Sequence, residues 1–302
     1  MSRDLVEHLQ TLMPDLEIRK HEQMSKHTTF RIGGPADLYI TPKANQVADI
    51  VKLCRQTGVP FFVFGNGSNL LVSDKGIRGV VIEIGKNMKQ VTVEDTVIKA
   101  QAGATLGMIA GEAAKAGLTG MEFASGIPGC LGGALVMNAG AYGGEMKQIV
   151  TEVECLTEDG ERITLSGEEM EFGYRTSLLS KKPYIAMSAT MKLTPGKEEE
   201  IRQRMQELNA QRLSKQPLEY PSAGSTFKRP EGYFAGKLIM DAGLAGYHVG
   251  DARVSEKHCG FVINTGNATA ADVRQLMTDV DRIVKEKFGV GLEPEVKFIG
   301  EF

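Results

Sequence analysis

A glycine-rich loop in the first quarter of the chain has the composition of an anion-binding turn. It lies between two apolar runs and consists of Phe64, Gly65, Asn66, Gly67, Ser68 and Asn69. Glycines let backbone N–H groups turn toward an anion, and the serine and asparagines add donors, which suits a pyrophosphate. The spacing is neither that of a P-loop nor that of the dinucleotide pattern G-x-G-x-x-G, because Leu70 occupies the third glycine position. A tight β-turn without a ligand is the alternative.

A second segment, residues 125–144, is rich in glycine and poor in charge. Glycine costs about 1 kcal/mol relative to alanine inside a helix, so its concentration here needs a reason. One explanation is that the backbone lies flat against a planar ligand. The alternative explanation is that two backbone segments pack closely against each other. Two such segments in one chain favour a dinucleotide. The cofactor-binding residues expected here are Ser125, Gly126, Gly129, Gly132, Gly133 and Asn138, beside Gly65, Asn66, Gly67, Ser68 and Asn69 of the first loop.

The composition narrows the classes of protein. The chain has 302 residues, of which 42% are hydrophobic and 24% charged, so it is globular with two or three domains and is not disordered. A net charge of −3 provides no basic field for nucleic acid. The histidines and cysteines lack metal-ligand spacing, which predicts no metal site. We expect the four cysteines to be reduced and mostly buried.

The N-terminal residues have helical spacing at Leu5, Leu9 and Leu12 and do not resemble a signal peptide. No apolar run approaches the ~18 residues that a membrane span needs. We therefore expect a cytoplasmic protein whose partners are small molecules rather than membranes or nucleic acids.

Hydrophobic periodicity predicts the elements that must position the glycine segments. Helices are expected at about 45–57 with Asn45 as a possible cap, after Thr105, at 197–215, near Leu238 and at 269–288. Strands are expected on both sides of the first glycine loop, at 80–84, 91–93, 97–100, 185–193, 260–263 and 295–299, and in a hairpin turned at Asp159-Gly160. Helices and strands mix without a strict βαβ rhythm, so the fold class is α+β.

Six motifs carry a resemblance to a known family. In chain order they are FGNGSNLLVSD, SGIPGCLGGALVMNAGAYGGE, FGYRTSLL, PSAGSTFKRP, AGKLIMDAGL and LEPEVKFIG. Together they resemble the UDP-N-acetylenolpyruvoylglucosamine reductase family, the flavoenzymes of bacterial peptidoglycan precursor synthesis. The resemblance runs from about Thr28 to Phe302. It is to the shorter family variant, which lacks an inserted loop that places a tyrosine over the substrate.

The resemblance implies a fold and cofactors. A two-lobed FAD-binding region of the vanillyl-alcohol-oxidase type would occupy residues 1–200, with lobes at about 1–78 and 79–200. A smaller α+β substrate domain would occupy residues 201–302. Many of those oxidases hold FAD covalently through a histidine in the first glycine loop, and residues 65–69 contain none. Noncovalent FAD, with NADPH as hydride donor, is therefore expected.

The resemblance also implies a catalytic trio of Arg175, Ser225 and Glu295. The reaction would reduce an enolpyruvyl ether to a lactyl ether. A guanidinium such as that of Arg175 can fork onto the substrate carboxylate as charge builds there. Ser225, in a small glycine loop, would supply the proton. Glu295, if kept protonated by an apolar site, would donate a hydrogen bond to the developing enolate.

Three cations near the serine motif, Lys215, Lys228 and Arg229, could contact the substrate diphosphate. Judged by residue type alone, Ser225 could be an ordinary turn serine. The five charged residues, Arg175, Glu295, Lys215, Lys228 and Arg229, could be ordinary surface charges. An FAD-linked oxidase of the same superfamily and a catalytically silent nucleotide-binding module are the competing functions. An oxidase has no need of Ser225 as an acid, and a silent module would be colourless.

Overall fold

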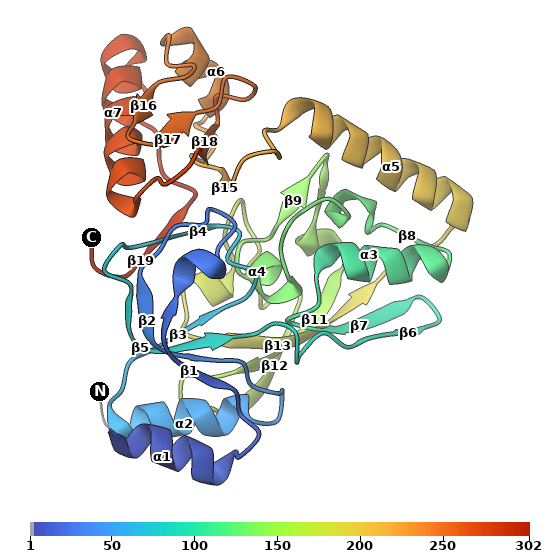
Figure 1. Ribbon diagram of the computed structural model, residues 1–302. Helices are drawn as coiled ribbons and strands as arrows, with labels where there is room; N and C mark the ends of the chain where they lie inside the picture. Colours follow the sequence, from blue (N-terminus) through green and yellow to red (C-terminus); the bar gives the residue numbers. More distant parts are fainter. Residues whose placement is uncertain (1–2) are drawn as a thin grey trace. The chain divides into compact units, whose positions relative to one another are not determined.

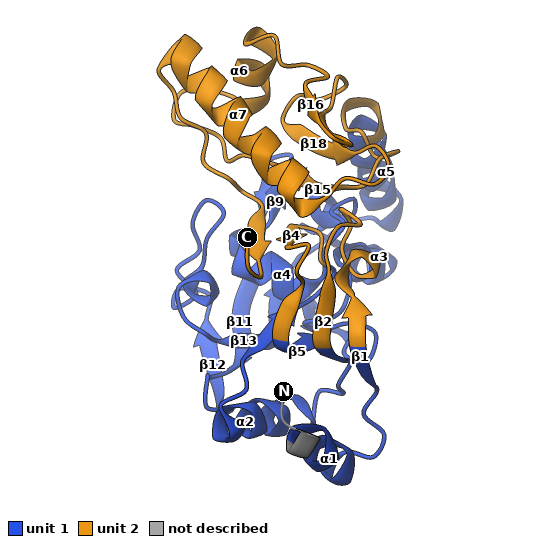
Figure 2. Ribbon diagram, turned by 60° about the vertical axis from the view of Figure 1, so that its left-hand side comes forward, with its two compact units in different colours: residues 1–20, 38–66, 79–212 blue, residues 21–37, 67–78, 213–302 orange. Residues whose placement is uncertain are grey.

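The computed structural model describes residues 3–302 (Figure 1). The chain divides into two compact units, coloured separately in Figure 2. Unit 1 contains residues 1–20, 38–66 and 79–212, and unit 2 contains residues 21–37, 67–78 and 213–302. Each unit has its own hydrophobic core, built from segments that are far apart in the sequence.

The helices follow the predicted apolar periodicity except for the one at 131–136, which lies in the glycine-rich segment and was not predicted. They are α1 (Arg3–Leu12), α2 (Val47–Thr57), α3 (Leu106–Lys115), α4 (Leu131–Val136), α5 (Glu198–Lys215), α6 (Ala235–Asp241) and α7 (Ala270–Phe288). Helix α2 buries Val47, Ile50, Val51 and Cys54 on one face and ends at Gly58 in the left-handed conformation, φ 64°. In α1, Leu5 and Leu9 are buried, whereas Leu12 is exposed.

Helix α3 begins as predicted at Thr105, whose Oγ1 accepts a hydrogen bond from the Met108 N–H at 3.2 Å. The prediction of Asn45 as the cap of α2 is wrong. The N-cap is Gln46, whose side-chain oxygen is turned back to accept the Lys43 N–H at 2.8 Å. That turn precedes the helix and leaves Asn45 outside it.

Unit 1 contains a five-stranded antiparallel sheet of order β12-β11-β13-β7-β6. Its strands are β6 (Val91–Glu94), β7 (Val97–Gln101), β11 (Val150–Leu156), β12 (Arg162–Ser166) and β13 (Ile185–Lys192). The hairpin turned at Asp159-Gly160 and the β6–β7 pair are both as predicted. The two-residue strands β8 (Leu118–Thr119), β9 (Gly140–Ala141), β10 (Gly144–Glu145) and β14 (Thr194–Pro195) were not predicted. Nor were the strands at 18–23, 35–40, 222–225, 248–249 and 252–254.

A second sheet has the order β1-β2-β5-β3, with β3 and β5 parallel. Its strands are β1 (Ile18–Gln23), β2 (Pro35–Ile40), β3 (Phe61–Phe64) and β5 (Ile77–Glu83). Four single-turn 3-10 helices complete the connections: η1 (Met24–Lys26), η2 (Glu122–Ala124), η3 (Met146–Gln148) and η4 (Leu178–Ser180).

Unit 2 packs α6 and α7 with an antiparallel sheet of order β15-β18-β17-β16. Its strands are β15 (Ser222–Ser225), β16 (His248–Val249), β17 (Ala252–Val254) and β18 (Phe261–Asn264), and a separate parallel pair joins β4 (Leu70–Val72) to β19 (Lys297–Ile299). The five apolar residues predicted for the inward face of α7 are all buried: Val273, Leu276, Met277, Val280 and Val284. The mixture of helices with mainly antiparallel sheets confirms the α+β class.

All four cysteines are free and buried, as predicted. Burial raises the pKa of Cys54 to about 11 and that of Cys155 to about 12. Over residues 3–302, no helix combines the length and apolar character needed to cross a membrane.

Candidate active site

The first glycine loop connects strands of different sheets. Strand β3 precedes it and pairs with β5, whereas β4 follows it and pairs with β19. The loop is therefore a crossover between sheets and not the tight turn of a hairpin. At Gly67 the backbone is left-handed, φ 61°, and a Cβ would lie 2.2 Å from the carbonyl oxygen of His27. The chain's own backbone thus requires this glycine.

The structure brings the two predicted cofactor segments together within unit 1. A Cβ at Gly65 would lie 2.0 Å from the Cys130 Sγ, so the first loop lies directly against the second segment. The Asn66 side-chain amide donates to the Pro128 carbonyl oxygen at 2.9 Å. Two segments that are more than sixty residues apart in the sequence are therefore in contact at Gly65 and Asn66.

Close packing explains part of the second segment. A Cβ at Gly126 would lie 2.4 Å from the Asn209 Oδ1, and one at Gly132 would lie 3.2 Å from the Cβ of Ala102. Gly133 differs, because it is exposed on α4 and a Cβ there would meet nothing within 4 Å. No protein contact requires this glycine, so its backbone is open to a ligand.

Asn138 is not open to a ligand through its side chain. It is 1% exposed and has a left-handed φ of 43°. Its Nδ2 donates to the Glu145 carboxylate at 3.0 Å and to the Gly173 carbonyl at 3.1 Å, and its Oδ1 accepts the Lys147 N–H at 2.9 Å. The amide therefore makes contacts within the protein.

Arg175 occupies the second central position of a tight turn. Gly173 and Thr176 exchange backbone hydrogen bonds across it, at 3.0 and 3.3 Å. Arg175 has a φ of 54°, a region that favours glycine, and its guanidinium carbon lies 5.4 Å from the centre of the Tyr174 ring. Backbone strain of this kind concentrates at functional sites.

Ser225 and Glu295 are brought together within unit 2. Ser225 ends β15, directly after Gly224 with a φ of 75°, and is half-buried. Its neighbour Thr226 accepts the Glu295 N–H at 2.9 Å through its carbonyl oxygen. Glu295 is 7% exposed. A hydroxyl and a buried carboxyl thus lie on adjacent backbone, although 70 positions separate them in the sequence.

The first glycine loop also reaches Glu295. The Asn69 amide donates to the Glu295 carbonyl oxygen at 3.1 Å, and the Asn69 carbonyl accepts the Lys297 N–H at 2.9 Å. The parallel pairing of β4 with β19 continues this contact. Within unit 2, the end of the predicted pyrophosphate loop therefore contacts the backbone of the strand that begins beside Glu295.

The three predicted diphosphate cations have different surroundings. Lys228 is partly buried and forms an ion pair with Glu293. Arg229 is exposed, donates to the Tyr233 carbonyl at 3.2 Å and lies 3.9 Å from the centre of the Phe234 ring. Lys215 is exposed at the end of α5.

The sequence interpretation missed two side chains that lie beside these segments. Ser177 is wholly buried, and its Oγ donates to the Val136 carbonyl of α4 at 2.9 Å. Arg212 is half-buried, and its Cδ would lie 3.3 Å from a Cβ at Gly126. Burial lowers the pKa of Arg212, which nearby Tyr142 opposes. The spacing of Arg212 four residues after the inward-facing Leu208 is a signal that could have found it.

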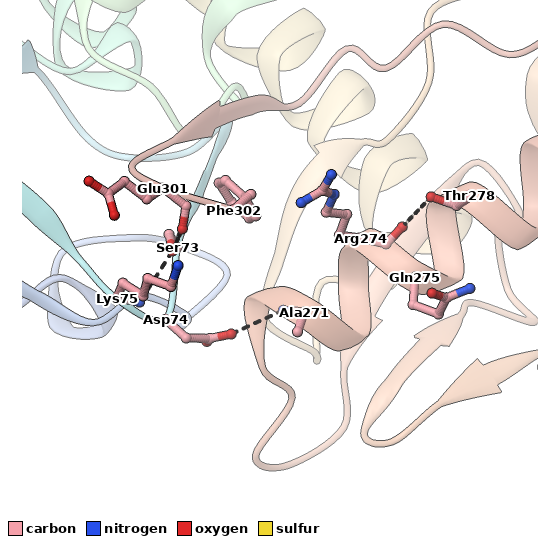
Figure 3. A pocket seen from close by; sticks show the side chains of 9 residues that line it. All are labelled: Ser73, Asp74, Lys75, Ala271, Arg274, Gln275, Thr278, Glu301 and Phe302. Carbon is pink, nitrogen blue, oxygen red and sulfur yellow. Dashed lines mark hydrogen bonds between the residues drawn. The ribbon is translucent and has the colours of Figure 1, made fainter.

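A cavity of about 460 Å³ in unit 2 contains none of the predicted site residues (Figure 3). It is lined by residues 73–75, the first turns of α7 and the last two residues. Asp74 points to the start of α7, where it accepts the Ala270 N–H at 2.8 Å and the Ala271 N–H at 3.0 Å. Its carboxylate is therefore used as a helix cap.

The residues present fit a bound dinucleotide. The backbone turns left-handed at Gly67, the two glycine segments lie in contact through Gly65, and Gly133 presents bare backbone. Residues 36–166 match the model of a family described as an FAD binding domain. Fold and site together define an FAD-binding protein, and the expectation of a flavoprotein is confirmed.

Residues 216–299 match the model described as the C-terminal domain of UDP-N-acetylenolpyruvoylglucosamine reductase. Proteins with that name are 54% identical to this chain in Agathobacter rectalis and in Caldanaerobacter subterraneus, with 100% of both chains covered. A relative in Clostridioides difficile is 50% identical over 99% of both. The chain belongs to the UDP-N-acetylenolpyruvoylglucosamine reductase family.

A solved structure supports the same assignment. The crystal structure of UDP-N-acetylenolpyruvylglucosamine reductase (MurB) from Thermus caldophilus is 38% identical to this chain. Its TM-score is 0.79, and the match covers 94% of this chain and 99% of that one. The resemblance carried by the six motifs is therefore confirmed, and so is the class of FAD-containing oxidoreductase.

Proposed function

We propose that this protein reduces UDP-N-acetylglucosamine enolpyruvate to UDP-N-acetylmuramate in the cytoplasm, with NADPH as the reductant. The names of its relatives supply the reaction. The observation that supports the proposal is the backbone hydrogen bond from the Glu295 N–H to the carbonyl oxygen of Thr226, the residue that follows Ser225.

Noncovalent FAD is the cofactor of this proposal. Bound to the two glycine segments, FAD would supply the hydride chemistry that links NADPH to the terminal vinyl carbon of the substrate. The two glycine segments hold it through backbone, and residues 65–69 offer no histidine for a covalent link. We assign this role to residues 1–200, with lobes at about 1–78 and 79–200, and substrate binding to residues 201–302.

Arg175 stabilises the charge that develops on the substrate. When hydride adds to the vinyl carbon, the electron pair moves toward the carbon that bears the carboxylate, which becomes enolate-like. A guanidinium is always charged and matches a carboxylate with two parallel N–H donors. The tight turn limits the positions that Arg175 can adopt, which suits stabilisation by a preorganised group.

Ser225 donates the proton that completes the lactyl ether. Its Oγ–H bond breaks as the C–H bond forms, and the alkoxide regains a proton from solvent. In this proposal Glu295, which is 7% exposed, donates a hydrogen bond to the enolate from a protonated carboxyl. Lys215, Lys228 and Arg229 contact the substrate diphosphate in this proposal.

The replacement Ser225→Ala tests the proton donor. The variant should bind FAD and accept hydride from NADPH almost normally, because neither step needs this hydroxyl. Its flavin should be reoxidised by the sugar nucleotide about 10²–10⁴-fold more slowly than that of the parent, the usual range for general acid catalysis. Stopped-flow absorbance of the pre-reduced protein measures this rate.

Ser222→Ala is the matched control, because Ser222 lies in the same strand and is also half-buried. Its reoxidation rate should equal that of the parent. A Ser225→Ala rate within about threefold of the parent lies far below the acid-catalysis range and would remove Ser225 from the mechanism. The proton would then come from water or from Glu295.

A further inference from the structure

Two buried side chains hold the turn that carries Arg175. Asn138 and Ser177 are 1% and 0% exposed, and neither belongs to the proposed catalytic trio. We infer that they are positioning residues, which fix Arg175 relative to the glycine segment proposed to hold the flavin. This inference rests on the proposed function of Arg175.

Asn138 holds the near side of the turn. It follows α4 by two residues, and its Nδ2 donates to the carbonyl of Gly173 at 3.1 Å, two residues before Arg175. The same amide is itself fixed, because it also donates to Glu145 at 3.0 Å and accepts the Lys147 N–H at 2.9 Å. Three hydrogen bonds leave this side chain one orientation.

Ser177 holds the far side. Two residues after Arg175, its Oγ donates to the carbonyl of Val136, the last residue of α4, at 2.9 Å. Its backbone N–H is also bonded, to the Ser180 Oγ at 3.3 Å. Arg175 thus lies between two anchors that both lead to the end of α4, and all these residues are in unit 1.

The backbone conformation explains why two anchors are needed. Arg175 has a φ of 54°, a left-handed conformation that residues other than glycine and asparagine rarely adopt, and Asn138 has a φ of 43°. Such conformations persist only where the surroundings impose them. Without the anchors the turn would relax, and the guanidinium would move away from its position.

The consequence is geometric coupling within unit 1. Helix α4 contains Gly133, the bare position of the glycine segment, so the same helix would set both the flavin surface and the arginine. A displacement of about 1 Å at a reacting centre can cost roughly 10²-fold in rate. Loss of either anchor should therefore slow the chemistry without removing a group that contacts the substrate.

The test uses Asn138→Gly and Ser177→Ala in the full-length FAD-bound protein. Glycine accepts a φ of 43° without strain, so the first variant removes the amide alone. Each variant should be reduced by NADPH at the parental rate, and its reoxidation by the sugar nucleotide should be about 10- to 100-fold slower. The two variants remove anchors on opposite sides of the turn. If one of them fails to bind FAD, the other still tests the inference.

Ser188→Ala is the matched control. Ser188 is a buried serine of unit 1 that donates to the carboxylate of Glu154, so its loss removes a comparable hydrogen bond. Its reoxidation rate should equal that of the parent. An equal slowing in this control would mean that general loosening of unit 1, and not the turn, explains the anchor variants.

A double-mutant cycle separates positioning from direct action. If the anchors act through Arg175, Ser177→Ala should slow reoxidation in the parent and have no further effect in the Arg175→Ala background. Multiplicative effects would overturn the inference. If Arg175→Ala alone has the parental rate, the proposed role of Arg175 fails. If Arg175→Ala is slow and both anchor variants are normal, only the present inference fails.

Discussion

Glu295 and Arg175 act on the same developing charge in the proposed mechanism, yet they belong to different units and different surroundings. Glu295 is almost fully buried. Its backbone N–H donates to the Thr226 carbonyl oxygen, and its own carbonyl oxygen accepts a hydrogen bond from the Asn69 amide. Arg175 is half-buried in a strained turn. Glu295 is thus almost wholly removed from water, whereas Arg175 as a residue is partly exposed.

Replacement of either residue should affect one half-reaction. Arg175→Ala and Glu295→Gln should each slow flavin reoxidation by the sugar nucleotide about 10²–10³-fold, the usual effect of removing a group that stabilises a developing charge. Flavin reduction by NADPH should stay near the parental rate. Stopped-flow measurement of the two half-reactions decides the matter, and equal slowing of both would instead place these residues in support of the cofactor.

The cysteines give a prediction about pH. Burial raises the pKa of Cys54 to about 11 and that of Cys155 to about 12, from an ordinary value of 9.0. A raised pKa means that the folded protein favours the neutral thiol. The resulting stability is complete below pH 9 and is lost as the pH rises toward 11–12.

At pH 8 these two thiols should react with a disulfide reagent at least about 10²-fold more slowly than in the unfolded protein, since the thiolate is the reactive form. Labelling of the native protein, with urea-unfolded protein as the control, measures the difference. Native rates close to the unfolded ones would show that the two sites open readily to solvent.

At the scale of elements, helix α4 contains Gly133, where the surrounding protein leaves room for a side chain. Gly133→Val should weaken FAD binding, because the new side chain enters space that we assign to the ligand. A steric misfit of about 1–3 kcal/mol corresponds to roughly 5- to 150-fold in affinity. Fluorescence titration of the apoprotein with FAD measures this change.

Gly111 provides the control for Gly133. It also lies inside a helix of unit 1, α3, and a Cβ there would likewise meet nothing within 4 Å. Gly111→Val should leave FAD affinity unchanged, and both variants should unfold at nearly the parental denaturant concentration. Parental affinity in Gly133→Val would place the ligand away from this face of α4.

Local sequence signals predicted the positions of most helices and strands, but few of the strand pairings and side-chain contacts between them. Thr105 and Gly58 mark helix ends by chemistry that acts within a few residues, so they could be recognised directly. The pairing of β4 with β19 joins residues 70–72 to residues 297–299, and no local pattern encodes it. Asn138 was expected at the cofactor because it lies in the glycine-rich segment, and its hydrogen bond to Gly173, 35 positions away, has no local signal.

At the scale of the whole molecule, unit 2 is discontinuous in sequence. Its core combines Phe30, Ile32 and Leu71 with residues of the last ninety positions, and Asp74 caps α7. Residues 213–302 expressed alone should therefore lack cooperative unfolding, because β19 has no partner and the core is incomplete. Thermal denaturation followed by circular dichroism tests this, and a sharp transition in the fragment would contradict it.

The late position of β19 has a consequence for biosynthesis. Strand β4 leaves the ribosome well before its partner β19, which follows it by about 225 residues. At about 5–20 residues per second, roughly 10–45 s pass before the two can pair. During that interval Leu71, which is fully buried in the finished protein, has no place to pack. The nascent chain therefore presents an unpacked apolar segment until β19 has been made.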